Sequence, residues 1–195
     1  MKSTKDLYIK NIKSASLFGG VQITNIILGL VKTKFVAILL GTNGFGMFSI
    51  FNSVARMSGD ITGLGVQTSG VKSISNNYKN DLATLNDSII YVRAWSIFAA
   101  LFGFIVTSFM SPLFNIISFS KSGGHLFELA FIPFAVSFTT LSGGEIAILK
   151  GTGKQSKLAR FMIAGTIVSL LVAIPLLYFF GTKAITLTLV ISSFF

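Results

Sequence analysis

The sequence predicts an all-α, polytopic membrane protein with five complete transmembrane helices and the start of a sixth. Hydrophobic residues make up 52% of the 195 residues and charged residues only 11%, and the mean hydropathy is +0.78. Soluble domains carry roughly 25% charged residues. The net charge of +10 comes from short basic clusters between long apolar runs. This pattern is typical of membrane proteins and argues against nucleic acid as a partner.

The expected helices follow from apolar runs, because a helix needs about 20 residues to cross the hydrocarbon. After a basic N-terminal segment, 1–13, a transmembrane unit covers 14–195. Its helices are expected at about 14–40, 45–71, 88–117, 126–149, 157–180 and 184–195. The run 45–71 is the least apolar, but without it its neighbours would need a long structureless connection. The run 184–195 is too short to cross a bilayer, so we expect a truncated sixth helix.

The first two of these helices are expected to meet at the turn Gly41–Gly44. The positions of lysine and arginine then predict orientation. One side receives Lys2, Lys5, Lys10, Lys13, Lys72, Lys79, Lys150, Lys154, Lys157 and Arg160, and the other receives Lys121 and Lys183. This asymmetry predicts a cytoplasmic N-terminus.

Two polar stripes mark candidate binding residues. Gln22, Asn25, Gly29 and Lys32 fall within an arc of roughly 80° of the first helix, so this face is expected to meet protein or water. The second helix repeats the pattern, and its stripe consists of Ser49, Asn52, Ser53, Arg56, Asp60, Gly63 and Gln67.

Arg56 and Asp60 lie four residues apart and can pair with each other. A charge at mid-membrane costs from about 2.5 kcal/mol upward, so such groups are expected to pair, bind a ligand or line water. A structural ion pair and a binding role both remain open.

Two further charges lie near the cytoplasmic side. Arg93, at the start of the third helix, is either an interfacial charge or a substrate contact. Glu145 can pair with Arg93, Arg56 or Lys150, or can act as a protonatable carboxylate. Asp60 and Glu145 are therefore the candidates for ion coupling or ion pairing.

Nothing in the sequence indicates an enzyme. Cysteine is absent and His125 is the single histidine, so no metal site is expected. The segment Lys150–Lys154 lacks the remaining residues of a phosphate-binding loop. No nucleophile and base stand at a usable spacing, and we expect no catalytic residues and no cofactor.

Two stretches carry a family resemblance. Phe35–Val54 contains Leu-Leu-Gly, a short turn and then Gly-Phe-Gly, and Ile148–Phe180 contains Ile174-Pro175 and is followed by Gly181. Together they resemble the Wzx-type O-antigen and polysaccharide flippases of the multidrug/oligosaccharidyl-lipid/polysaccharide exporter superfamily. The resemblance implies one six-helix lobe of a transporter that has about twelve helices in two lobes around a central cavity.

The resemblance further implies that a polyprenyl-diphosphate glycan, such as an undecaprenyl-diphosphate oligosaccharide, is flipped across the bacterial inner membrane. Lys32 and Arg56 match cationic positions that meet the diphosphate in related flippases, and Gln22, Asn25 and Arg93 are further candidate contacts. The implied partners are this glycan, membrane lipids and a second six-helix lobe. The multidrug branch has an acidic residue in the first helix, which this chain lacks. A multidrug or small-solute exporter and a non-transporting fragment remain alternatives.

Overall fold

The computed structural model describes residues 4–78, 82–119 and 126–194, and within the helices it describes side chains except those of 4–18, 21, 82, 119, 126 and 127. This part of the chain is entirely helical apart from short turns and contains no strand, which confirms the all-α prediction. The elements are α1 (Thr4–Thr62), α2 (Val66–Asn77), α3 (Leu82–Phe119), α4 (Leu126–Leu129), α5 (Ile132–Gly151), α6 (Gln155–Phe180), the 3₁₀ turn η2 (Gly181–Ala184) and α7 (Ile185–Phe194).

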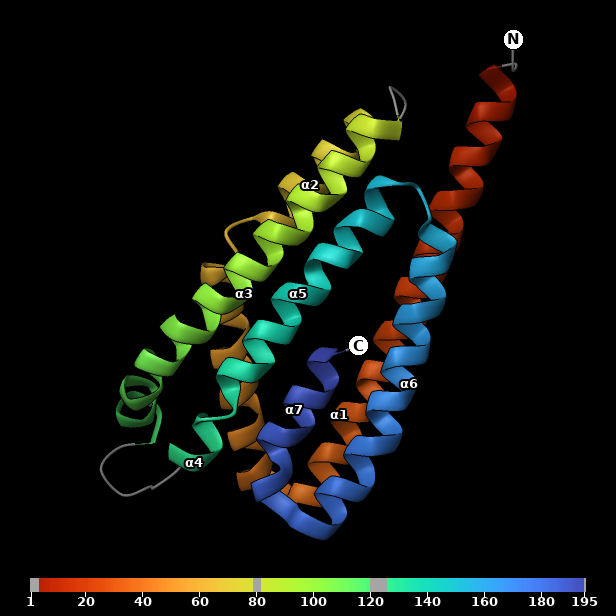
Figure 1. The fold of residues 1–195 in the computed structure, drawn as a ribbon. Coiled ribbons are helices and arrows are strands. Elements are labelled where there is room, and N and C mark those ends of the chain that lie inside the picture. Colours follow the sequence, from red (N-terminus) through yellow and green to blue (C-terminus); the bar gives the residue numbers. More distant parts are fainter. Residues whose placement is uncertain (1–3, 79–81, 120–125, 195) are drawn as a thin grey trace.

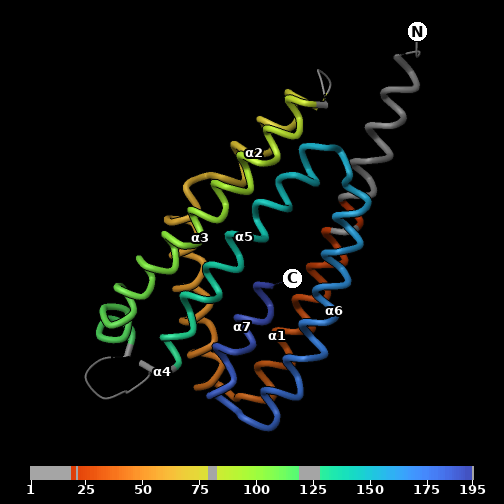
Figure 2. Tube along the Cα trace, in the orientation of Figure 1, coloured from red at the N-terminus to blue at the C-terminus, as the bar shows by residue number. Residues whose placement is uncertain are grey.

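The helices form two groups that converge at one end of the molecule (Figure 1). The first half of α1 packs against α6, and the second half of α1 lies with α2, α3 and α5. The short helix α7 starts at the end where the groups converge and ends between α5 and α6 (Figure 2). It contacts both of those helices and α1. The two groups therefore diverge toward the end at which α5 turns into α6 (Figure 1).

Gly41 is where α1 changes direction. Its φ of 67° and ψ of −172° interrupt the helical backbone, and an L-residue rarely adopts this combination. The two halves of α1 run in opposite senses on either side of this point (Figure 1). The interruption lies at the start of the expected turn Gly41–Gly44.

Four helical segments are long and apolar enough to cross a membrane, and they support a multi-pass membrane protein: Gln22–Thr62, Ala83–Ser118, Ile132–Gly151 and Gln155–Phe194. The first contains the interruption at Gly41 and the last contains η2. The count of five complete crossings and a sixth partial one stays a prediction.

A break at residues 63–65 separates α1 from α2 within the run 45–71, which was expected to be one helix. Leu64 and Gly65 both have positive φ, 49° and 66°, so the backbone leaves the right-handed helix there. Glycine tolerates this conformation, whereas leucine adopts it only where its surroundings hold it. The prediction of one uninterrupted helix over 45–71 is therefore wrong at this point.

Two buried clusters hold the helices together. The larger lies where the groups converge, around Val36, Phe51, Ile132, Leu177 and Ile185, and therefore joins α1, α5, α6 and α7. The smaller joins α2, α3 and α5. Many bulky apolar side chains instead point outward, as is normal for helices that face lipid.

The α3–α5 interface depends on a close approach at Gly144. A Cβ atom at this position would lie 2.7 Å from the Cβ of Ser96. Close approach of this kind is how helices associate in membranes, because small residues let backbones come together. Among the residues used in the sequence analysis, Lys2, Lys79, Lys121 and His125 lie outside the part of the chain described here.

Candidate functional site

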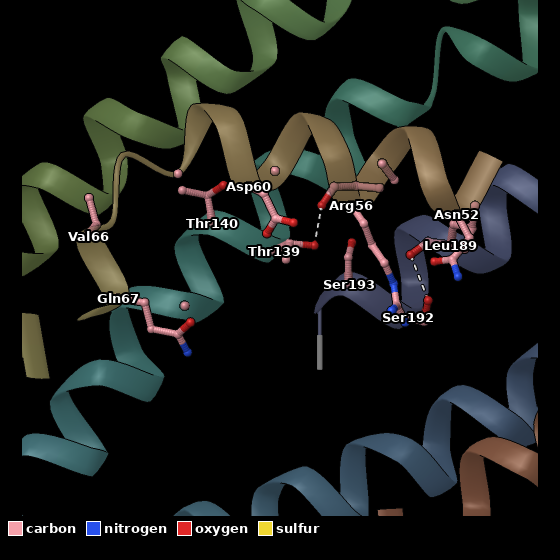
Figure 3. A pocket seen from close by; sticks show the side chains of 15 residues that line it. Asn52, Arg56, Asp60, Val66, Gln67, Thr139, Thr140, Leu189, Ser192 and Ser193 are labelled. Carbon is pink, nitrogen blue, oxygen red and sulfur yellow. Dashed lines mark hydrogen bonds between the residues drawn. The ribbon is translucent and has the colours of Figure 1, made fainter. Parts of the chain in front are cut away.

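A polar cavity of about 310 Å³ lies between the second half of α1, α5 and α7 (Figure 3). We call it the central cavity. Its lining residues from α1 and α2 are Asn52, Ala55, Arg56, Gly59, Asp60, Gly63, Val66 and Gln67, and those from α5 and α7 are Ala135, Thr139, Thr140, Gly143, Leu189, Ser192 and Ser193.

Part of the polar stripe expected for the second helix lines this cavity, whereas Ser49 and Ser53 of that stripe are not among the lining residues. Asn52, Arg56, Asp60, Gly63 and Gln67 all line it, because helical periodicity places residues three and four apart on one face. The break at 63–65 changes the backbone but leaves Gln67 on the cavity wall. Interrupted helices beside a polar cavity are a recurring feature of transporters.

Arg56 and Asp60 face the same cavity without pairing. Within the described part of the chain, no ion pair or hydrogen bond joins Arg56 to Asp60. In Figure 3 the Arg56 side chain extends toward Ser192 and Ser193 of α7. The structural ion pair that the spacing allowed is therefore absent, and both charges are available to a third group.

The hydroxyl groups of α5 and α7 supply acceptor oxygens to the cavity. Thr139 donates to the carbonyl of Ala135 at 2.8 Å, and Ser192 donates to the carbonyl of Leu189 at 2.9 Å. Thr140 and Ser193 donate in the same way, to Val136 and Val190. Since each hydroxyl hydrogen is used within its own helix, the oxygen lone pairs remain to accept hydrogen bonds.

These hydroxyl residues were missed in the sequence analysis. The available signal in the sequence was two adjacent pairs of hydroxyl residues, Thr139-Thr140 and Ser192-Ser193, within mainly apolar segments that carry other hydroxyl residues as well. Serine and threonine are common in membrane helices because their hydroxyls bond to the backbone. The pairs alone therefore did not indicate a site.

The polar stripe of the first helix lies elsewhere, against α6. The Lys32 ammonium donates to the hydroxyl of Ser169 at 3.0 Å, and the hydroxyl of Thr166 donates to the amide oxygen of Asn25 at 3.4 Å. Gln22, closer to the start of the stripe, has an exposed side chain. None of these residues lines the central cavity, so the structure does not bring the two stripes together.

Arg93 and Glu145 form an ion pair between α3 and α5. The Arg93 Nε and Nη2 atoms lie 2.7 Å and 3.2 Å from the two carboxylate oxygens of Glu145, a bidentate arrangement. Of the three partners considered for Glu145, Arg93 is the one with which it pairs in the structure. Both residues line a separate cavity of about 510 Å³ that also includes Phe161 of α6 and Phe194 of α7.

The predicted site residues thus occupy three places: the central cavity, the α1–α6 face and the Arg93–Glu145 pair. No group of three or more metal-ligating side chains occurs in the described residues. Of these places, the central cavity gathers the largest variety of polar groups, with a cation, an anion, amides and hydroxyls from four helices, α1, α2, α5 and α7.

Comparison with known proteins adds one relative. No family model matches the chain, and no solved structure matches it. A protein of Shigella dysenteriae named "Putative O-antigen transporter" is 29% identical over 105 residues, which cover 50% of this chain and 26% of the relative. The chain therefore aligns with about a quarter of that protein's length. The similarity supports a transport role.

Proposed function

We propose that this chain is part of a flippase that moves a polyprenyl-diphosphate-linked oligosaccharide across the bacterial cytoplasmic membrane for polysaccharide or O-antigen export. The observation that carries the proposal is that Arg56, which forms no ion pair within the described part of the chain, faces a hydroxyl-lined cavity among helices of membrane-spanning length. The similarity to a protein named as an O-antigen transporter supports the same substrate class.

The chemistry of the central cavity suits a head group that is both anionic and hydroxylated. The Arg56 guanidinium offers several N–H donors in a fork that matches phosphate oxygens. The hydroxyl oxygens of Thr139 and Ser192 can accept hydrogen bonds from sugar hydroxyls. Such groups replace part of the hydration that the head group loses, while the polyprenyl tail remains among lipid acyl chains.

The size of the cavity supports a larger assembly. Pockets that hold small ligands span about 300–1,000 Å³, and the central cavity, at about 310 Å³, is at the low end. It can hold the diphosphate and the first part of the glycan, and a second six-helix lobe would supply the opposite wall. Alternating access by movement of two such repeats about a midplane site is the usual mechanism for this architecture.

The proposed topology has a cytoplasmic N-terminus, five crossings and part of a sixth. It divides the segment Gln22–Thr62 at Gly41 into two crossings, and it treats α7 as the start of the sixth. The start of α1, the end of α2 and the α5–α6 turn then share the cytoplasmic side (Figure 1).

Lys32, Asn25 and Gln22 remain proposed substrate contacts. For Lys32 to bind a phosphate, its ammonium would have to exchange the Ser169 hydroxyl for the ligand. Arg93 would likewise have to share or release Glu145. Lys32 and Arg93 are therefore secondary to Arg56, which forms no ion pair with the residues that the structure describes.

The test replaces Arg56 by glutamate in the protein as it is expressed in its own cells. Because hydrogen bonds to charged groups contribute about 1.5–3 kcal/mol, surface glycan is expected to fall about 10- to 100-fold. Lipid-linked precursor should accumulate in the membrane, and Arg56→Lys should retain part of the export. Arg160→Gln removes an exposed positive charge that lines none of these cavities and serves as the control. Normal surface glycan in the Arg56→Glu cells, at normal protein abundance, refutes the proposal.

A cation-coupled exporter of drugs or small solutes is the second candidate, and Asp60 favours it. A carboxylate that faces a cavity without an arginine partner can bind a cationic solute or a coupling ion. In that case deletion of the gene raises drug sensitivity and leaves surface glycan unchanged, the reverse of the result expected for a flippase.

A further inference from the structure

A second polar cavity lies between α2 and α5, at the end of the molecule where α5 turns into α6. It has a volume of about 430 Å³, and we call it the rim cavity. Its polar lining includes Gln67, Lys72, Ser75 and Asn76 from α2 and Lys150 from α5. The two helices pack side by side, and their ends meet at this rim (Figure 1).

The rim cavity carries two positive charges and no negative one. The lining residues other than Lys72 and Lys150 are uncharged. In the residues that the structure describes, neither lysine forms an ion pair with a carboxylate. Two ammonium groups around one cavity, with a serine hydroxyl and an asparagine amide as further donors, are complementary to an anion with several oxygens.

Gln67 connects the rim cavity to the central cavity, because its side chain lines both. Along α5, Lys150 lines the rim cavity and Thr139 lines the central cavity, and the two residues lie about 16 Å apart at the helical rise of 1.5 Å per residue. Along the other wall, polar residues continue from Lys72 through Gln67 to Asp60 and Arg56. Gln67 is thus the residue that the two cavities share, with the lysines on the side of the rim cavity and the arginine on the side of the central cavity.

We propose that the rim cavity is a phosphate-binding site at which the anionic head group docks before it moves past Gln67 to Arg56 in the central cavity. The shared chemistry is that of a phosphate ester, which either a polyprenyl diphosphate or an anionic phospholipid head group can provide. The role of the site in transport rests on the proposed function, whereas its binding of phosphate does not.

Ser75→Cys tests binding directly, since the 195 residues contain no cysteine and Ser75 lines the rim cavity. The rate at which a water-soluble maleimide modifies the new thiol is measured in phosphatidylcholine nanodiscs, with and without inorganic pyrophosphate. A bound anion would shield the thiol, so pyrophosphate is expected to slow the modification. This protection should weaken in 1 M salt, where the Debye length falls from about 10 Å to about 3 Å.

Substitution of the lysines tests which groups hold the anion. Lys72→Gln with Lys150→Gln should weaken protection by pyrophosphate about fivefold for each lysine removed, because a lysine near an anionic surface contributes about that much. Lys154→Gln with Lys157→Gln removes the same charge from exposed positions nearby that do not line the rim cavity. Protection should persist in this control pair.

Nanodiscs that contain phosphatidylglycerol, without pyrophosphate, separate the two sources of phosphate. If Ser75→Cys reacts more slowly in them and the effect needs Lys72 and Lys150, a lipid head group occupies the site. If only pyrophosphate protects, the site is specific for a diphosphate. Either result supports a phosphate site. Equal reaction rates with and without both probes, or protection that survives loss of both lysines, overturns it.

Export by cells distinguishes failure of this site from failure of the proposed function. The Lys72→Gln, Lys150→Gln pair is expected to reduce surface glycan most when lipid-linked precursor is scarce, because docking then limits the rate. Normal export by this pair, alongside loss of export in Arg56→Glu, overturns the docking role and leaves the flippase standing. Normal export by both the lysine pair and Arg56→Glu refutes the flippase function. If pyrophosphate still protects Ser75→Cys in that case, the phosphate site itself is supported.

Discussion

Gly144→Ala tests the packing of α3 against α5, which is the most extensive interface in the molecule. The added Cβ would lie 2.7 Å from the Cβ of Ser96 and still closer to its hydroxyl oxygen. The hydroxyl can rotate away, but the Cβ cannot. The helices must therefore separate by roughly half an ångström, and overpacking of this kind costs about 1–3 kcal/mol. Alanine regains about 0.5–1 kcal/mol over glycine in a helix, so a net loss of stability of up to about 2.5 kcal/mol is expected.

The neighbouring glycine provides a matched control. A Cβ at Gly143 would meet no atom within 4 Å, so Gly143→Ala should be neutral or slightly stabilising. The assay heats the purified protein in mild detergent and measures the fraction that still elutes as a single species by size-exclusion chromatography. Ser96→Gly, combined with Gly144→Ala, moves the small residue to the other helix and should recover at least half of the loss. Equal midpoint temperatures for Gly143→Ala and Gly144→Ala would contradict this account of the interface. So would a double variant, Ser96→Gly with Gly144→Ala, that recovers none of the lost stability.

The turn at Gly41 and the break at Gly65 make different demands on the side chain. Gly65 has φ 66° and ψ 15°, which asparagine tolerates, whereas Gly41 has φ 67° and ψ −172°, which is accessible essentially to glycine alone. The substitution Gly65→Asn should therefore lower the stability of the fold by less than about 1 kcal/mol, and Gly41→Asn should lower it by about 1–3 kcal/mol. Both losses are measured by the same heating assay. Similar losses at the two positions would refute the distinction. For the Arg93–Glu145 pair, whose side chains are 57% and 55% exposed, removing either charge should cost about 0.2–1 kcal/mol. The exchange Arg93→Glu with Glu145→Arg should recover most of that loss, and additive losses in the exchanged pair would show that the two charges do not interact.

Local sequence was a good guide where a single physical property decides the structure. Charge-free apolar runs predict helices, because the hydrocarbon offers no partner to an unsatisfied backbone group. The helix α6 ends at Phe180, because Gly181 has a positive φ and stops the helix, and a glycine directly after an apolar run is a local signal for such an end. The break at 63–65 escaped prediction because it places Leu64 in the left-handed region, and leucine carries no local signal for that conformation.

The candidate site was predictable in part for a related reason. Helical periodicity places Asn52, Arg56 and Asp60 on one face whatever surrounds the helix, and this face does line the central cavity. Periodicity does not say which helix lies opposite, so Thr139 and Ser192 were missed. It also could not assign the partner of Glu145, which lies 52 residues from Arg93 in sequence.

The sequence by itself determined that the described chain is helical, that it carries segments suited to a membrane and that its charged residues gather on particular helix faces. These properties follow from backbone hydrogen bonding, transfer from water to hydrocarbon and the 3.6-residue turn, all of which act within one segment. Only the tertiary structure decided that Lys32 meets Ser169, that Arg56 and Asp60 remain apart, and that Gln67 joins two cavities. Those outcomes depend on which small residues let helices approach and on where the chain turns, and both are settled by packing between segments far apart in the sequence.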